Sequence, residues 1–356
     1  MPYSIQKVFL TGANGFVACH ILSDLIKVGY LVTATVRSKT KSQEILDAHP
    51  EWKDIVKFVY VSDFTMPGAF NEAIKGEGGK LNYIIHTASP VTFDVEDIQK
   101  EIIDPAVQGT TSLLKSAHEY GGPQVKRVVV LSSIAAIVNP MEDTNITGDP
   151  YSEKDWDPVT AEMAVEQKNP LFGYCAAKTL AEKAAWKFLE DNKTSFDMTV
   201  INPDVVIGPM IQNVSSPQKI NKTNRITIYN FLDGTTTGVE AWGLPFYHFV
   251  DVRDVSRAHV LSLDSPAASN QRVALVHGLI TPQLVVNIIR KNFPELKSKV
   301  PEGNPSQIVP DGIELSRWDN KKSYQVFEKN WTYRDLETSV VDTVSDILKR
   351  EKEWQK

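Results

Sequence analysis

The sequence predicts a doubly wound α/β fold built on a parallel sheet, and two observations support that prediction. Short runs of apolar, β-branched residues alternate with longer helical stretches through the N-terminal half of the chain. These runs are continuously apolar, as is typical of strands that are buried on both faces of a parallel sheet. In such a fold, ligands bind beyond the carboxyl ends of the strands.

The individual elements follow from these runs. Strands are expected at residues 7–11, 31–36, 56–61, 82–86, 127–132 and 198–203. Helices are expected between them, including segments at 15–28, 97–119 and 170–191. Because the alternation stops after residue 204, we predict a larger sheet domain over 1–204 with a return segment near 246–265, and a smaller, discontinuous domain over 205–356.

The C-terminal part begins with a polar stretch, 211–225, that is too polar to form core and too long to be a tight connection, so it is interpreted as a lid. A final helix is expected behind Thr332 and Asp335, which are plausible start signals. Its apolar residues recur at helical spacing, at Val340, Val341, Val344, Ile347 and Leu348. The cleft between the two domains is expected to take the substrate.

Composition excludes several classes of protein. The chain has 356 residues, 42% of them hydrophobic, and a net charge of −6, which argues against nucleic acid as a main partner. No apolar run reaches the length of a membrane span, and no secretory signal is evident. Cys19 and Cys175 form neither a CxxC pair nor a metal cluster, so we expect no metal and a reducing, cytoplasmic location. Nothing indicates an oligomer, although one is possible.

The stretch "TGANGFVA" forms a glycine loop after the first expected strand and opens an apolar helix. Gly12 and Gly15 have the spacing G-x-x-G, which differs from the G-x-G-x-x-G fingerprint. Both patterns serve the same physical purpose, which is to let the backbone approach a pyrophosphate closely at a helix N-terminus. The context of strand, loop, helix and second strand favours a dinucleotide site over a simple tight turn.

The second expected strand ends in a basic turn, "VRSKTK". NAD-binding versions of this fold place a carboxylate there for the ribose 2′-hydroxyl, whereas here Arg37, Lys39 and Lys41 follow the strand and no carboxylate occurs after it before Glu44. A guanidinium binds a phosphate through paired hydrogen bonds, so NADPH is preferred over NADH. A solvated basic turn is the alternative. Asp63 is either an acceptor for the adenine amino group or an ordinary loop residue.

A tyrosine and a lysine stand four residues apart in "NPLFGYCAAKTLAEKAAWKFLE". Asn169 and Pro170 are helix start signals, so Tyr174 and Lys178 lie on one helical face. A lysine ammonium about 4 Å from the phenol, at an effective dielectric near 20, favours the phenolate by up to about 4 kcal/mol. The phenol then becomes a usable acid. A second Tyr-x-x-x-Lys match, at residues 3 and 7, enters a strand and shares no face.

A carbonyl that is being reduced develops negative charge on its oxygen, which calls for a second hydrogen-bond donor. "VVVLSSIAA" places Ser132 and Ser133 at the carboxyl end of the fifth expected strand. The residues by themselves do not choose between the two serines.

Several segments together resemble the extended short-chain dehydrogenase/reductases, in the dihydroflavonol-reductase-like branch and close to yeast NADPH-dependent methylglyoxal and ketone reductases. The resemblance covers nearly the whole chain and implies a Rossmann fold. Its segments are "TGANGFVA", "HTASP", "RVVVLSS", "YCAAK", "NPDVVIGP", "DVRDVSRAH" and "WDNKKS".

Carried over position by position, the resemblance implies a catalytic set of Ser133, Tyr174 and Lys178. It also implies cofactor contacts at Gly12, Asn14, Gly15, Phe16, Val17, Arg37, Lys41, Asp63, Phe64, Thr87, Ala88, Ser89, Tyr174, Lys178, Pro203 and Val206. A substrate pocket for a small or medium apolar carbonyl compound is expected at Val91, Phe93, Ile134, Val205 and Phe246. Where the family has Asn in "PAVNGT", this chain has Gln108, which puts a proton relay through that position in doubt.

The implied reaction is the NADPH-dependent reduction of aldehydes, ketones or 2-oxoaldehydes. Tyr174 protonates the carbonyl oxygen, Ser133 steadies it, and Lys178 lowers the phenol pKa and holds the nicotinamide ribose. Two rival hypotheses share part of this evidence. A sugar-nucleotide epimerase or dehydratase has the same Tyr/Lys pair but retains NAD, and a non-enzymatic NADP-binding regulator needs no Tyr/Lys/Ser set.

Overall fold

The structure is a computed structural model that describes residues 5–89, 95–141, 149–242, 246–313, 315–327 and 331–354. Within them, a parallel seven-stranded sheet runs in the order β3-β2-β1-β4-β5-β6-β9. Its strands are β1 (Lys7–Thr11), β2 (Leu31–Val36), β3 (Val56–Tyr60), β4 (Tyr83–His86), β5 (Arg127–Leu131), β6 (Asp197–Pro203) and β9 (Gln271–Leu275). The predicted doubly wound α/β fold is therefore confirmed.

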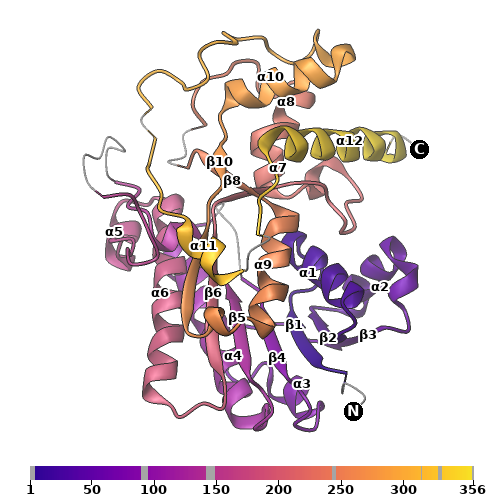
Figure 1. Cartoon of the computed structure of the whole chain (residues 1–356), viewed down its shortest axis with the longest axis vertical. Coiled ribbons are helices and arrows are strands. Elements are labelled where there is room, and N and C mark those ends of the chain that lie inside the picture. Colours follow the sequence, from indigo (N-terminus) through magenta and orange to yellow (C-terminus); the bar gives the residue numbers. More distant parts are fainter. Residues whose placement is uncertain are drawn as a thin grey trace.

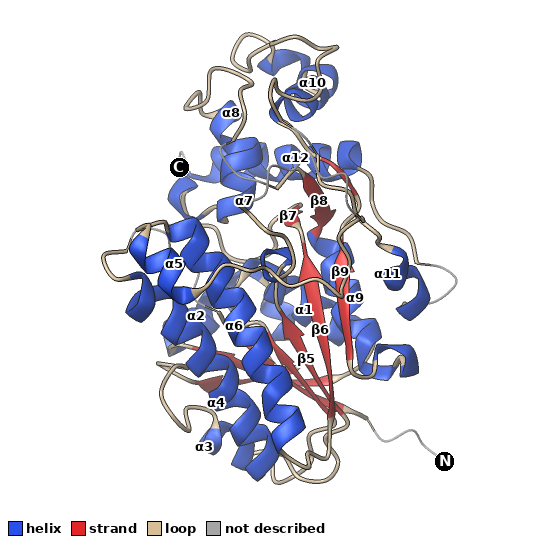
Figure 2. Ribbon diagram, turned by 90° about the vertical axis from the view of Figure 1, so that its left-hand side faces the viewer, coloured by secondary structure: helices blue, strands red, loops and turns tan. Residues whose placement is uncertain are grey.

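Helices cover both faces of this sheet, because each face of a sheet that is buried on both sides needs an apolar layer against it. One layer holds α1 (Phe16–Lys27), α2 (Lys39–Ala48) and α9 (Val252–Asp264). The other holds α3 (Asn71–Lys75), α4 (Asp104–Tyr120) and α6 (Pro170–Asp191), and Figure 2 shows α4 and α6 side by side along it. The short helix α5 (Ala161–Glu166) packs against α6, and the short helix α11 (Lys321–Val326) packs against β9.

A smaller unit lies beyond the carboxyl ends of the strands, at the top of Figure 1. It holds a second sheet of order β10-β8-β7 and its own apolar core. Its strands are β7 (Val205–Ile207), β8 (His248–Asp251) and β10 (Gly278–Leu279), and its helices are α7 (Lys222–Asn224), α8 (Asn230–Leu232), α10 (Pro282–Asn292) and α12 (Leu336–Trp354). The boundary between 204 and 205 stays a prediction.

Local signals place two helices where the sequence predicts them. Asn169 Oδ1 accepts a hydrogen bond from the Leu171 N–H at 3.0 Å, and Pro170 begins α6. Asp335 Oδ1 accepts from the Thr338 N–H at 2.7 Å ahead of α12. The helix expected over 97–119 differs at its start, since a π-helical turn over Gln99–Ile103 precedes α4.

Two expectations for the C-terminal half need correction. Val214 and Ile220, from the segment interpreted as too polar for core, are buried in the apolar core of the smaller unit. The indole N–H of Trp354 also donates to the Val214 carbonyl at 2.8 Å, so α12 holds this segment down. The chain also returns to the main sheet at β9, a strand that was not predicted, because a five-residue run in a loop-rich region is a weak signal.

No helix in the described residues combines the length and the apolar character that a membrane span requires.

Candidate active site

The glycine loop lies where β1 meets α1. Gly12 has a φ of +68°, and a Cβ on it would stand 3.2 Å from the Ala88 Cα, closer than nine in ten real contacts of this kind. The Thr11 hydroxyl accepts hydrogen bonds from the backbone N–H groups of Thr87 and Ala88, each at 3.1 Å. This ties the loop to the residues that follow β4. Glycine is required at position 12 because of both its backbone angle and this close approach.

A cavity of about 310 Å³, hereafter the nucleotide cavity, opens along this loop. Its lining includes nine residues that the sequence predicts as cofactor contacts, together with Thr35, Val36 and Val61. The nine are Gly12, Asn14, Gly15, Arg37, Lys41, Phe64, Thr87, Ala88 and Ser89. Backbone crowded at a helix start beside a basic turn fits a phosphorylated dinucleotide.

Other predicted cofactor contacts do not line this cavity. Phe16 packs against the core of the smaller unit and Val17 against the main core. Pro203 is buried within β6, and Val206 of β7 packs against the main core. Asp63 accepts hydrogen bonds from the N–H and hydroxyl of Thr65, at 2.9 and 2.6 Å.

The basic end of the cavity carries acidic neighbours. Lys41 Nζ lies 2.7 and 2.9 Å from the two carboxylate oxygens of Glu44. Hydrogen bonds from Thr65 and, more weakly, the charge of Arg37 hold the pKa of Asp63 below its ordinary value. A phosphate at this end would therefore compete with carboxylates for the two cations.

Phe64 forms part of the cavity wall and lies against α4. A Cβ on Gly109 would be 2.6 Å from the Phe64 ring, so glycine is the residue that lets the ring lie flat on the helix. This explains the glycine of "PAVQGT". The neighbouring Gln108 is exposed on α4 and lines neither this cavity nor the substrate cavity described below.

The structure distinguishes the two serines after β5. The Ser132 hydroxyl donates to Glu182 Oε2 at 2.6 Å and is buried behind the site. The Ser133 side chain is hydrogen-bonded with Tyr174, and its Oγ also accepts from the Ala135 N–H at 3.1 Å. Ser133 is thus the serine beside the phenol, as the family resemblance implies.

Lys178 joins this pair from one turn along α6. Its Nζ donates to Ser89 Oγ at 3.3 Å, at the edge of the nucleotide cavity, and lies 5.8 Å from the centroid of the Tyr174 ring. The structure therefore brings the predicted Ser133, Tyr174 and Lys178 together between two cavities.

The electrostatics differ from the expectation. Burial raises the pKa of Tyr174 to about 12, against a smaller lowering by the Ser133 hydrogen bond. Burial also lowers the pKa of Lys178 to about 8, partly opposed by the charge of Glu182. Desolvation of the phenol dominates its pKa in this structure, and the lysine donates to Ser89, so the expected lowering of the phenol pKa by Lys178 stays a prediction.

A buried polar network behind the site was missed by sequence reasoning. Glu182 Oε2 accepts from Asn202 at 2.8 Å as well as from Ser132, and its Oε1 accepts from Arg272 Nε at 2.5 Å. Asn202 also donates to the backbone carbonyl of Ser133 at 3.1 Å. The one available signal was the position of Glu182, a carboxylate four residues after Lys178 on a buried helix face.

A second cavity of about 380 Å³, the substrate cavity, lies on the other side of Tyr174. Three predicted pocket residues line it, Ile134, Val205 and Phe246, whereas Val91 and Phe93 lie outside the described residues. Sequence reasoning missed the rest of its lining. Besides Ser133 and Tyr174, it comprises Leu171, Asp204, Lys222, Thr223, Ile226, Thr227 and Trp242.

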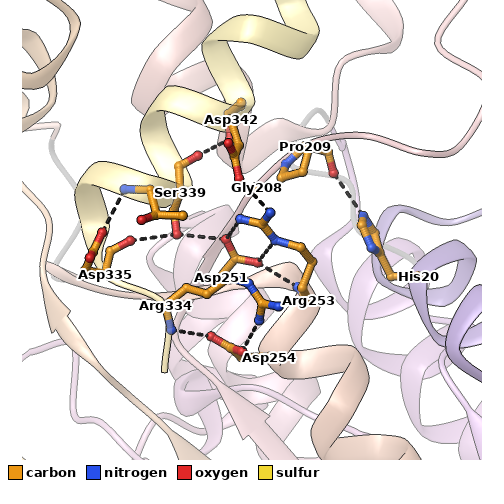
Figure 3. A network of polar contacts seen from close by, with 12 residues as sticks. His20, Gly208, Pro209, Asp251, Arg253, Asp254, Arg334, Asp335, Ser339 and Asp342 are labelled. Atoms are coloured by element: carbon orange, nitrogen blue, oxygen red, sulfur yellow. Dashed lines mark hydrogen bonds and ion pairs between the residues drawn. The ribbon is translucent and has the colours of Figure 1, made fainter. Parts of the chain in front are cut away.

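Ion pairs join the smaller unit to α9, which covers one face of the main sheet (Figure 3). Arg253 pairs with Asp251 at 2.7 Å and with Asp342 of α12 at 2.6 Å, and Arg334 pairs with Asp254. The Ser339 hydroxyl donates to Asp251 at 2.8 Å. This network includes three charged residues of "DVRDVSRAH": Asp251, Arg253 and Asp254.

Comparisons with known proteins agree with this geometry. The family model described as "NAD dependent epimerase/dehydratase family" matches residues 8–276. The chain is 36% identical to a putative NADPH-dependent methylglyoxal reductase, GRP2, of Candida albicans, over 97% of this chain and 99% of the relative. It is 37% identical to the ketoreductase azaE of Aspergillus niger, over 97% and 98%.

A solved structure shows the same fold. The crystal structure of the yeast methylglyoxal/isovaleraldehyde reductase Gre2 complexed with NADPH superposes with a TM-score of 0.87 at 31% identity, over 98% of this chain and 99% of that one. With its parallel sheet, its glycine loop and these matches over nearly its full length, the chain belongs to the NAD dependent epimerase/dehydratase family, the extended short-chain dehydrogenase/reductases.

Proposed function

We propose that the protein is an NADPH-dependent carbonyl reductase that converts small or medium aldehydes, ketones or 2-oxoaldehydes to alcohols. One observation carries the proposal. Tyr174 lines the substrate cavity and is hydrogen-bonded with Ser133, while Lys178, one turn away, reaches the nucleotide cavity through Ser89. A proton donor thus stands between a dinucleotide site and an apolar pocket.

The relatives support the choice of reaction and cofactor. The GRP2 protein and yeast Gre2 are named as methylglyoxal reductases, and azaE as a ketoreductase. The GRP2 name includes NADPH, and the Gre2 structure holds it. Since this chain matches each of them over nearly its whole length, a reductase is favoured over the epimerase alternative.

The residues of the nucleotide cavity fit NADPH. The backbone of Gly12 and Gly15 would hold the pyrophosphate, and Arg37 with Lys41 would hold the 2′-phosphate. Lys178 would hold the nicotinamide ribose. When bound, NADPH supplies the hydride that adds to the carbonyl carbon.

The chain's own residues then manage the carbonyl oxygen. Ser133 and Tyr174 donate hydrogen bonds to it, and these bonds strengthen as negative charge develops. The Tyr174 phenol is protonated near neutral pH and acts as the general acid. The ammonium of Lys178 stabilises the phenolate left after proton transfer. The apolar wall of the substrate cavity excludes water, and its limited shape selectivity favours a broad range of carbonyl compounds.

Loss of NADPH absorbance with a panel of 2-oxoaldehydes, diketones and aryl ketones tests this function. Tyr174→Phe should abolish turnover and leave NADPH affinity nearly unchanged, because the substitution removes the proton donor alone. Robust reduction of carbonyl compounds by the Phe variant would refute the role of Tyr174 as the proton donor. Purified protein that retains NAD through gel filtration and consumes no NADPH would favour the epimerase.

We further propose that the protein acts in the cytoplasm on small molecules, without nucleic acid. Its negative net charge and its two unpaired, buried cysteines support this proposal.

A further inference from the structure

The substrate cavity contains a carboxyl group that the proposed mechanism does not use. Asp204 stands between β6 and β7, lines the cavity together with Ser133 and Tyr174, and is only 6% exposed. Most of the surrounding wall is apolar, formed by Ile134, Leu171, Val205, Ile226, Trp242 and Phe246. An ionised carboxylate is costly in such a wall unless it is paired.

The two oxygens of this carboxyl group have different surroundings. Oδ1 accepts a hydrogen bond from the Val205 N–H at 2.7 Å, whereas Oδ2 makes no hydrogen bond or ion pair with any described residue. Because Oδ1 is held as an acceptor, a proton on the carboxyl group belongs on Oδ2. The cavity-lining carboxyl group then offers a hydrogen-bond donor.

Its charge state supports that assignment. Burial raises the pKa of Asp204 to about 8, with the Val205 N–H acting in the opposite direction, so the neutral acid predominates at pH 7. Lys222 lines the same cavity.

We propose that Asp204 is a specificity-determining residue that donates a hydrogen bond from Oδ2 to a second oxygen of the substrate, so that the cavity prefers keto esters to simple ketones. This inference rests on the proposed reductase function. The reacting carbonyl occupies Ser133 and Tyr174, and the ester oxygen reaches Asp204. A simple ketone leaves this donor without a partner, which is the situation in which polar sites discriminate most strongly.

The test compares ethyl acetoacetate with 2-heptanone, which has the same number of chain atoms but lacks both ester oxygens. We expect the ratio of their kcat/KM values to favour the ester and to fall about tenfold in Asp204→Val, which removes the donor. Asp204→Asn keeps both a donor and the acceptor for Val205 and should stay within about threefold of the wild-type ratio. Asp233→Asn, at a surface turn of the same unit, is the matched control and should change nothing.

A separate variant controls for a loss of stability, because Asp204→Val also removes the oxygen that accepts the hydrogen bond from the Val205 N–H. Should that variant fail to fold, Asp204→Ser replaces it, because its shorter hydroxyl can still serve the Val205 N–H. Calorimetric titration of ethyl acetoacetate into the protein with NADP⁺ provides an equilibrium measure of the same preference. The affinity for ethyl acetoacetate should weaken by a similar factor in the Val or Ser variant.

Three results would overturn the inference: an unchanged ratio in the Val or Ser variant, an equal fall in Asp204→Asn, or an Asp204-dependent preference for diethylaminoacetone. The last would mean that an ionised Asp204 binds a cation. Failure of the reductase function looks different, since the wild-type protein would then consume no NADPH with either ketone. Calorimetry still decides the subsite in that case, because absence of an Asp204-dependent preference for the ester would refute it.

Discussion

The two adjacent serines after β5 provide a matched pair of substitutions with opposite expected effects. Ser132 donates to the buried carboxylate of Glu182 at 2.6 Å, and that carboxylate also pairs with Arg272. Ser132→Ala removes a hydrogen bond to a charged group, and we expect it to lower the free energy of unfolding by about 1.5–3 kcal/mol. Since its hydroxyl is turned toward Glu182, kcat should change by less than about threefold.

Ser133→Ala should show the reverse. It removes a donor to the carbonyl oxygen, a loss of roughly 2.7–4 kcal/mol in transition-state stabilisation, or about 10²- to 10³-fold in kcat. In stability it loses the hydrogen bond with Tyr174 and the acceptor for the Ala135 N–H at 3.1 Å, each about 0.5–1.5 kcal/mol.

Urea unfolding and steady-state NADPH oxidation measure the two effects on the same preparations. Equal losses of kcat in both variants would refute the assignment of Ser133 to the site and Ser132 to the network. So would a stable Ser132→Ala protein with no activity. A Thr at position 133 should recover part of the lost kcat, because it restores the hydroxyl.

Four further predictions concern the cofactor site and the lysine. Arg37→Ala should raise KM for NADPH at least about tenfold and leave KM for NADH nearly unchanged, and equal increases would contradict a role for Arg37 at the 2′-phosphate. Gly109→Ala places a Cβ 2.6 Å from the Phe64 ring, so we expect about 1–3 kcal/mol lower stability together with weaker NADPH binding, measured by urea unfolding and fluorescence titration. The kcat/KM of the wild-type protein should fall above about pH 8, where Lys178 loses its proton, and an alkaline limb that begins only near pH 10 would argue against this. Because the pKa of Lys178 is lower in the folded chain than in the unfolded one, the unfolded chain binds more protons between about pH 8 and 10.5, and this group should make stability rise with pH in that window.

The sequence by itself determined the features whose signals are local. Continuous apolar runs predicted the first six strands of the main sheet, and the caps at Asn169 and Asp335 predicted two helix starts. The Tyr174/Lys178 spacing predicted a shared helical face. Each of these depends on residues within a few positions of one another, where backbone geometry and periodicity act directly.

Only the tertiary structure decided which side chains meet. The choice of Ser133 over Ser132 depends on Glu182 and on the packing of α6 against the turn that follows β5, at Ile134–Ala136, which no local pattern contains. The placement of Asp204 and Lys222 in one cavity depends on how the smaller unit sits over the strand ends. The pKa of Tyr174 also depends on burial, which is a property of the packed chain. Spacing along the chain predicts a helical face, but desolvation and hydrogen-bond partners come from segments far apart in sequence, and these determine the chemistry of the site.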